Sequence, residues 1–179
     1  MQGNLATWAN ALTALRVCLI PSLILSIQNN DWLIASTLFT FAVVSDVLDG
    51  KLARRFNQAT PFGGLFDHLT DAVFVTVGCW ALASAGYLTA WLPPLIIAAF
   101  AQYMLDSKAL LGQPLRTSYV GRINGILYFV LLGVILGANL LDWAWLLIVA
   151  SWTAWLLVAS TLVSMTERAF TLIRLRRNN

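Results

Sequence analysis

Long apolar runs separated by short polar stretches make up almost the whole chain. Each run is close to the length of about 20 apolar residues that a helix needs to cross a bilayer. The pattern predicts an all-α integral membrane protein with six transmembrane helices. These helices are expected over about residues 10 to 28, 33 to 52, 64 to 85, 91 to 111, 123 to 141 and 144 to 165.

Composition supports this prediction independently. Hydrophobic residues make up 59% of the chain and charged residues only 11%, whereas about a quarter of the residues in a soluble globular domain are charged. The six runs leave no stretch for a separate soluble domain, so residues 1–179 are expected to form a single membrane domain. Arg16 and Pro21 interrupt the first run, and no small-residue cleavage site follows it, so we expect a retained helix and not a secretory signal.

The distribution of basic residues predicts the orientation. The turns near 29–31, 86–89 and 138–142 contain no Lys or Arg, so all 11 basic residues fall on the other side. By the positive-inside rule, both termini are expected to face the cytoplasm. The net charge of +3 follows from this asymmetry and does not require a nucleic acid partner. The basic C-terminal tail is expected to meet anionic lipid headgroups.

Acidic residues are concentrated around one connection. Asp46, Asp49, Asp67 and Asp71 are four of the eight acidic residues in the chain. The first two are three residues apart and the last two are four apart, so each pair shares one face of its helix. Pro61 is suited to the first turn of the helix that carries Asp67 and Asp71. Four carboxylates in one cleft repel one another unless cations balance them. Oxygen ligands without cysteine favour Mg²⁺ or Mn²⁺ over zinc.

The residues between these aspartates suggest a phosphate ligand. Gly50 and Gly63 allow another group to approach the backbone closely, and Lys51 and Arg54 add positive charge beside the acidic cleft. If the second helix enters the bilayer near Trp32, the aspartates begin about 21 Å into a layer about 30 Å thick. This depth favours a lipid whose polar head reaches the metals from the side.

The pattern D-x-x-D-G-x-x-A-R, eight further residues and then G-x-x-x-D-x-x-x-D resembles the signature of the CDP-alcohol phosphotransferase family. Upstream, Asn10, Thr13 and Arg16 resemble the first helix of the phosphatidylglycerophosphate synthase branch. Downstream, Ser118 to Arg122 is similar to a Ser-x-x-Gly-Lys stretch of that branch. The fixed positions of the signature are Asp46, Asp49, Gly50, Ala53, Arg54, Gly63, Asp67 and Asp71.

This resemblance implies a metal-dependent phosphatidyl transfer. The four aspartates would hold one or two Mg²⁺ or Mn²⁺ ions against the pyrophosphate of CDP-diacylglycerol. Asp71 would also act as the catalytic base toward the acceptor hydroxyl, and CMP would leave. The resemblance further implies a homodimer in a bacterial inner membrane, with the active site facing the cytoplasm. The CDP-lipid pocket would be shaped by Gly50, Ala53, Arg54 and Gly63.

The identity of the acceptor is left open by the sequence. Glycerol 3-phosphate is the first choice, and Lys108, Arg116 and Arg122 lie on the correct side to bind its phosphate. However, His68 follows the third aspartate where the phosphatidylglycerophosphate synthase branch has proline, and Asn124 replaces a lysine. Three alternative acceptors therefore stay open: inositol phosphate, an amino alcohol, or phosphatidylglycerol, which is the acceptor in a cardiolipin synthase.

Several of these residues also have an interpretation that involves no catalysis. The aspartates could be a packing device paired with Lys51 and Arg54, although four of them beside glycines favour a functional site. Lys108 and Arg116 could be ordinary cytoplasmic charges. We expect a supporting or packing role for His68 and a structural ion pair for Asp106. A cation transporter is a further alternative, but the outer halves of the runs are mostly apolar, which disfavours an ion path.

Overall fold

A computed structural model describes residues 8–55, 61–106 and 119–177 of the chain. This part of the chain is all-α and contains no strand. The predicted all-α architecture with six helices is therefore confirmed for the described residues. The helices are α1 (Trp8–Gln28), α2 (Trp32–Arg55), α3 (Pro61–Ser84), α4 (Leu92–Asp106), α5 (Tyr119–Leu140) and α6 (Ala144–Arg177).

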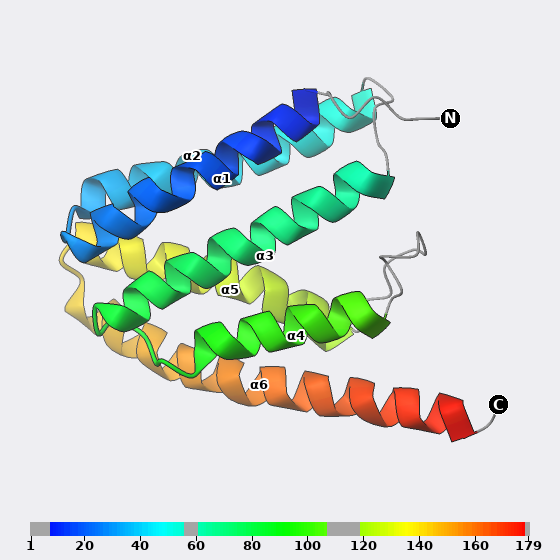
Figure 1. Cartoon of the computed structure of the whole chain (residues 1–179). Coiled ribbons are helices and arrows are strands. Elements are labelled where there is room, and N and C mark those ends of the chain that lie inside the picture. Colours follow the sequence, from blue (N-terminus) through cyan, green and yellow to red (C-terminus); the bar gives the residue numbers. More distant parts are fainter. Residues whose placement is uncertain (1–7, 56–60, 107–118, 178–179) are drawn as a thin grey trace.

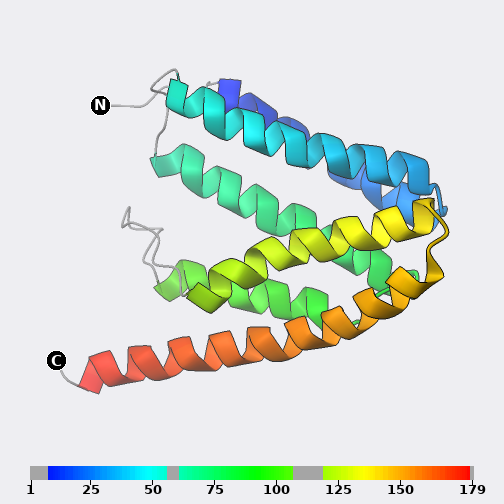
Figure 2. The same ribbon diagram turned by 180° about the vertical axis from the view of Figure 1, so that it is seen from behind.

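The helices run alternately up and down the bundle (Figure 1). One end contains the three short turns that join α1 to α2, α3 to α4 and α5 to α6, and we call it the short-turn end. The start of α1 and the end of α6 both lie at the opposite end (Figure 1). Helix α1 packs on α2 and α3, and α4 packs on α3 and α6. Helix α5 joins the two groups because it contacts α2, α3 and α6, as the view from behind shows (Figure 2).

Apolar side chains fill the interior of the bundle. Leu23, Phe74, Leu132 and Leu136 are all fully buried. The rings of Phe74 and Phe129 stack with their centroids 6.5 Å apart, which ties α3 to α5. This core holds the helix pairs together on the short-turn side of the carboxylates.

Two glycines allow close contact between helices. A Cβ added at Gly78 would lie 2.7 Å from Leu132 Cδ2, and one at Gly133 would lie 2.7 Å from Phe39 Cε1. Gly133 therefore lets α5 approach Phe39 of α2 closely. At Gly137, one turn further along α5, an added Cβ would meet no atom within 4 Å.

The three short turns are tightly built. Asn30, Gly86 and Asp142 have φ values of 60°, 84° and 54°, the left-handed conformation that ends many helices. Backbone hydrogen bonds close each turn, for example from Tyr87 N to Leu82 O at 2.9 Å. Aromatic residues gather at this end, where the rings of Trp32 and Tyr87 meet edge to face. These aromatic residues thus lie at the end of the bundle remote from the carboxylates.

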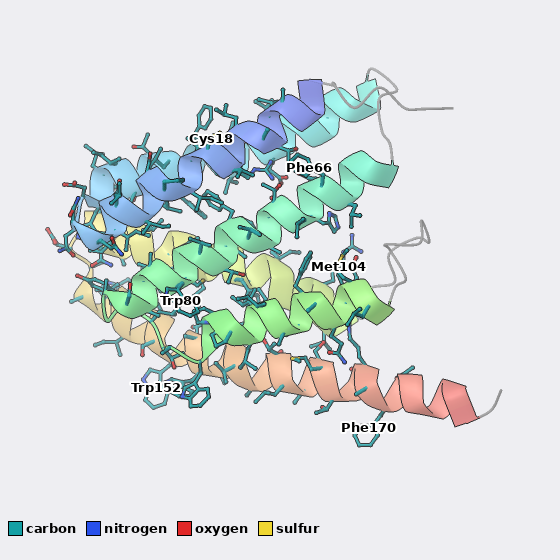
Figure 3. All side chains as sticks on the ribbon, in the orientation of Figure 1. Cys18, Phe66, Trp80, Met104, Trp152 and Phe170 are labelled. Atoms are coloured by element: carbon teal, nitrogen blue, oxygen red, sulfur yellow. The ribbon has the colours of Figure 1, made fainter. Side chains whose placement is uncertain are left out.

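Four of the six helices are long and apolar enough to cross a membrane. Helices α2 and α4 have shorter apolar stretches, Trp32–Leu48 and Leu92–Leu105. In α2 the stretch is short because the acidic and basic residues of the signature occupy the last turns. Large apolar side chains also cover the outside of the bundle: Trp152 and Phe170 project outward from α6 and are 71% and 72% exposed (Figure 3). Such a surface is suited to contact with lipid.

Candidate active site

Three of the predicted metal ligands meet in the structure. Asp46 lies in the second half of α2, and Asp67 and Asp71 lie one turn apart in the first half of α3. One carboxylate oxygen from each residue lies within 4.8 Å of the other two. Helix α3 begins at Pro61, as predicted, and this start places Asp67 and Asp71 on one face opposite Asp46. Three hard oxygen donors at this spacing fit a divalent cation such as Mg²⁺ or Mn²⁺.

Arg16 on α1 reaches the same carboxylates. Its Nη2 lies 3.2 Å from Asp46 Oδ1, and its Nη1 donates to Asp67 Oδ1 at 3.2 Å and also to Asp71 Oδ1. The Arg16 side chain is 1% exposed, whereas those of Asp46, Asp67 and Asp71 are 42%, 28% and 26% exposed. From the sequence, Arg16 was counted among the basic residues of the cytoplasmic side, and this contact was not predicted. The signals in the sequence were its lone charge inside an apolar run and its place in the motif of the first helix.

A cavity of about 490 Å³ opens beside this cluster. Arg16, Asp46, His68 and Asp71 form one part of its lining. Helices α4, α5 and α6 supply the facing part, and apolar side chains make up most of the wall. The polar residues that line the cavity from these three helices are Gln102, Tyr103, Arg122, Asn124, Tyr128, Thr161, Ser164 and Arg168.

Hydrogen bonds fix several of these polar groups. Asn124 Oδ1 accepts from Ser160 Oγ at 2.8 Å, and Gln102 Nε2 donates to the backbone oxygen of Met165 at 3.0 Å. Asn124 Nδ2 and Gln102 Oε1 are buried without a hydrogen-bond partner among the described residues. They line a cavity and keep hydrogen-bonding capacity, so they are suited to a polar ligand.

A cation lies close to these amides. The Arg168 guanidinium carbon is 5.2 Å from the centre of the Tyr103 ring, a geometry that favours a positive charge over the ring face. Arg168 and Arg122 both line the cavity. Arg122 was predicted from the sequence as a possible acceptor ligand. Arg168, Gln102 and Asn124 were not, because spacing along the chain does not show which faces of α4, α5 and α6 meet.

Several predicted site residues fall outside the side chains that the structure describes. Asp49, Gly50, Ala53 and Arg54 belong to α2 and Gly63 belongs to α3, so the helices carry them, but their side-chain positions are not described. The side chain of Asp106 is likewise outside the described set. Lys108 and Arg116 lie in the segment 107–118, outside the described residues.

His68 lines the cavity but does not belong to the group of carboxylates that can share one ion. Toward the short-turn end, the described core next to the cluster is apolar, with Phe74, Leu82 and Ile135 fully buried. An ion path across the bundle would need polar groups there. The geometry is that of a site entered from one side, which disfavours the transporter alternative.

Comparison with known proteins agrees with this geometry. The family described as CDP-alcohol phosphatidyltransferase matches residues 6–165 of the chain. This match covers α1 to α5 and most of α6, and it includes every predicted ligand of the metal and of the CDP-lipid.

Individual relatives include three bacterial proteins, each described as a CDP-diacylglycerol--glycerol-3-phosphate 3-phosphatidyltransferase. The protein from Pseudomonas fluorescens is 42% identical over 92 residues, which are 49% of this chain and 47% of that protein. The protein from Pectobacterium atrosepticum is 33% identical over 137 residues, or 69% and 71% of the two chains. The protein from Yersinia enterocolitica is 29% identical over 147 residues, or 72% and 79%. The chain therefore belongs to the CDP-alcohol phosphatidyltransferase family.

Proposed function

We propose that this chain is a phosphatidyltransferase of phospholipid biosynthesis that uses CDP-diacylglycerol as donor and glycerol 3-phosphate as acceptor. The observation that carries the proposal is the meeting of Asp46, Asp67 and Asp71 at a cavity whose far wall contains Arg122 and Arg168. Carboxylates for a metal on one wall and cations on the other match a pyrophosphate donor and a phosphate-bearing acceptor. Relatives described as glycerol-3-phosphate 3-phosphatidyltransferases support the same choice.

One or two Mg²⁺ or Mn²⁺ ions are the proposed cofactors. Asp46, Asp67 and Asp71 offer oxygens within reach of one ion, and Asp49 follows Asp46 by three residues on α2. When bound, a divalent cation neutralises charge on the pyrophosphate and on the phosphoryl group in transfer. The aspartates hold this charge at a fixed place between α2 and α3.

Asp71 is the proposed general base. It lines the cavity on the same helix as Ala72 and Val75. Its carboxylate takes the proton of the acceptor hydroxyl while the hydroxyl oxygen forms a bond to the phosphorus of the phosphatidyl group. The bond from that phosphorus to the CMP oxygen breaks, and CMP leaves. General-base assistance is typically worth about 10² to 10⁴ in rate.

The CDP-lipid is proposed to bind along the end of α2 and the start of α3. Gly50, Ala53 and Gly63 are small, so a nucleotide can approach the backbone there, and Arg54 can pair with its phosphate oxygens. The fatty acyl chains would stay among lipids against the apolar outer surface of the bundle. The cluster lies in the half of the bundle remote from the short turns, so a headgroup can reach it without leaving the membrane.

The acceptor is proposed to occupy the α4 to α6 side of the cavity. Arg122 and Arg168 supply charge for its phosphate, and Gln102 and Asn124 offer a buried acceptor and a buried donor for hydroxyl groups. Lys108 and Arg116 stay as further proposed contacts. Inositol phosphate fits the same cations, whereas an amino alcohol does not need them. Phosphatidylglycerol would bring a second lipid to the site.

We further propose that the site faces the cytoplasm, because the basic residues carried by the described helices lie in the half of the bundle opposite the short turns. All six helices are then proposed to be embedded, with α2 and α4 as the short ones. The predicted homodimer also stays a proposal, and chemical crosslinking in native membranes would test it.

The reaction is tested by measuring CMP release from CDP-diacylglycerol by the purified full chain in detergent with Mg²⁺ or Mn²⁺. Glycerol 3-phosphate, phosphatidylglycerol, inositol phosphate, serine and ethanolamine are supplied in parallel. Asp71→Asn is the test variant and Asp142→Asn the matched control, since Asp142 lies in the turn between α5 and α6. We expect CMP release with glycerol 3-phosphate, unchanged in the control and lowered about 10² to 10⁴-fold in Asp71→Asn.

Release of CMP with a different acceptor alone would replace glycerol 3-phosphate and keep the reaction. No acceptor-dependent CMP from folded, metal-supplied protein would overturn the proposed function. A loss of activity in Asp142→Asn equal to that in Asp71→Asn would also contradict the assignment of the base.

A further inference from the structure

Arg16 is a buried cation whose place in the site the proposed reaction does not explain. It comes from α1, which contributes none of the four signature aspartates. Both of its terminal nitrogens are directed at carboxylates: Nη2 at Asp46, and Nη1 at Asp67 and Asp71. The guanidinium group therefore lies at the centre of the same three carboxylates that can share a metal ion.

Burying an arginine in a membrane-embedded bundle costs several kcal/mol unless carboxylates compensate its charge. The rest of this face of α1 is the ordinary interior of a helix bundle, with Ile20, Leu23 and Ile27 buried below Arg16. An apolar side chain at position 16 would pack there without this cost. The charge itself must therefore be what the position requires.

The net charge of the cluster explains why position 16 requires a positive charge. Among the described side chains, three ionised carboxylates and one guanidinium leave two negative charges, which one divalent cation balances. Without Arg16, the same carboxylates would carry three negative charges in a site 26% to 42% exposed, and their repulsion would separate α2 from α3. Arg16 supplies a permanent positive charge that does not depend on the supply of metal.

We propose that Arg16 is a resident counter-ion that shares the aspartates with the divalent metal and so sets the metal affinity of the site. This inference rests on the proposed function only for the identity of the metal-binding cluster. Arg16 contacts Oδ1 of Asp46, Asp67 and Asp71, so these three oxygens are engaged before a metal binds. Each carboxylate keeps a second oxygen for the metal. The site then binds its ion more weakly, because a fixed positive charge lies within a few ångströms of it.

Two consequences follow, and they have opposite signs. Removing the positive charge of Arg16 makes the cluster more negative and frees three oxygens, so affinity for a divalent cation rises. The same change leaves the carboxylates unbalanced whenever metal is scarce, so stability falls in a chelator. A residue that only oriented the aspartates would act differently, since its loss would weaken metal binding, typically by about 10 to 100-fold for such supporting partners.

The test measures Mn²⁺ binding to the purified full chain in detergent by the electron paramagnetic resonance signal of free Mn²⁺. Thermal unfolding is followed on the same samples in EDTA and in saturating Mn²⁺. Arg16→Met removes the charge and keeps a long unbranched side chain. Arg16→Lys keeps the charge without the planar fork that reaches three carboxylates. Arg174→Met, near the end of α6, removes a positive charge elsewhere and is the matched control.

We expect Arg16→Met to bind Mn²⁺ at least about tenfold more tightly than the wild type, with Arg16→Lys between the two and Arg174→Met unchanged. The rise in unfolding temperature from EDTA to Mn²⁺ should be larger in Arg16→Met, since tighter binding stabilises more. Folding of Arg16→Met in Mn²⁺ but not in EDTA would also support the proposal.

Equal or weaker Mn²⁺ binding by Arg16→Met would overturn the proposal and make Arg16 an orienting residue. Failure of Arg16→Met to fold even in Mn²⁺ would overturn it as well, because the metal is expected to supply the missing charge. If neither the wild type nor Arg16→Met binds Mn²⁺, the proposed metal site itself is contradicted. If the wild type binds Mn²⁺ and Arg16→Met binds it no more tightly, only the role of Arg16 is contradicted.

Discussion

The hydroxyl pair between α5 and α6 gives a prediction that can be worked through from the structure. Tyr128 Oη lies 2.5 Å from Thr161 Oγ1, and Thr161 Oγ1 donates its single hydrogen to Leu157 O at 2.6 Å. Tyr128 must therefore donate and Thr161 must accept. Both residues are buried, with exposed fractions of 6% and 1%.

Because Tyr128 is the donor and Thr161 the acceptor, the two single substitutions are expected to cost different amounts of stability. Thr161→Val removes the acceptor and leaves the buried Tyr128 hydroxyl without its partner, which typically costs about 1 to 3 kcal/mol. Tyr128→Phe removes the donor, but Thr161 keeps its bond to Leu157 O, so the cost is about 0.5 to 1 kcal/mol. Hydrogen bonds between membrane helices reach at most about 1.7 kcal/mol, so we expect about 1.5 kcal/mol for Thr161→Val. In the double variant no hydroxyl is left unpaired.

The measurement is the free energy of unfolding in mixed micelles for the wild type, both single variants and the double variant. We expect Thr161→Val to be less stable than Tyr128→Phe. The double variant should lose about 1 kcal/mol less than the two single losses added together, since each single loss contains the same hydrogen bond. Thr153→Val is the matched control, because Thr153 lies on the same helix, is only partly buried and donates to a backbone oxygen of that helix, Val149 O.

Three results would refute this reasoning. The donor assignment is wrong if Tyr128→Phe costs more than Thr161→Val. Strict additivity would show that the two hydroxyls do not interact across the α5 and α6 interface. A loss in Thr153→Val as large as that in Thr161→Val would attribute the effect to helix propensity and not to the buried pair.

Two further predictions concern packing and the acceptor. Gly133→Leu should lower the unfolding temperature in detergent because its side chain would meet Phe39, whereas Gly137→Leu on the same helix should have little effect; equal losses would refute the role of close packing. Arg168→Met should raise KM for glycerol 3-phosphate by about 10 to 150-fold, the value of a charged hydrogen bond of 1.5 to 3 kcal/mol, with KM for CDP-diacylglycerol unchanged. A matching rise for CDP-diacylglycerol would place Arg168 on the donor side instead.

The carboxylate half of the site could be predicted from the sequence because it depends on local spacing. Asp67 and Asp71 are four residues apart, and any helix that begins at Pro61 puts them on one face. The connection between α2 and α3 is short, so Asp46 had to lie nearby. The same locality explains why the helix number and most helix ends were predicted within a few residues.

The other half of the site could not be predicted, because it depends on which faces of distant helices meet. Arg16 reaches Asp71 across 55 positions of sequence, and nothing in the first apolar run shows that its lone charge points inward. Gln102, Asn124 and Arg168 come from three helices, and each has an ordinary explanation when read alone.

The three short turns give the bundle a mechanical asymmetry. Each turn is closed by backbone hydrogen bonds at a residue with positive φ. The two helices of each pair are therefore held together by a tight turn at one end only. Helix α5 has 22 residues and is about 33 Å long, so a rigid tilt of about 5° at its turn moves its far end by about 3 Å. The cavity lies toward that far end, where leverage is greatest. A small tilt of a helix at its turn would therefore change the width of the cavity far more than the position of the turn itself.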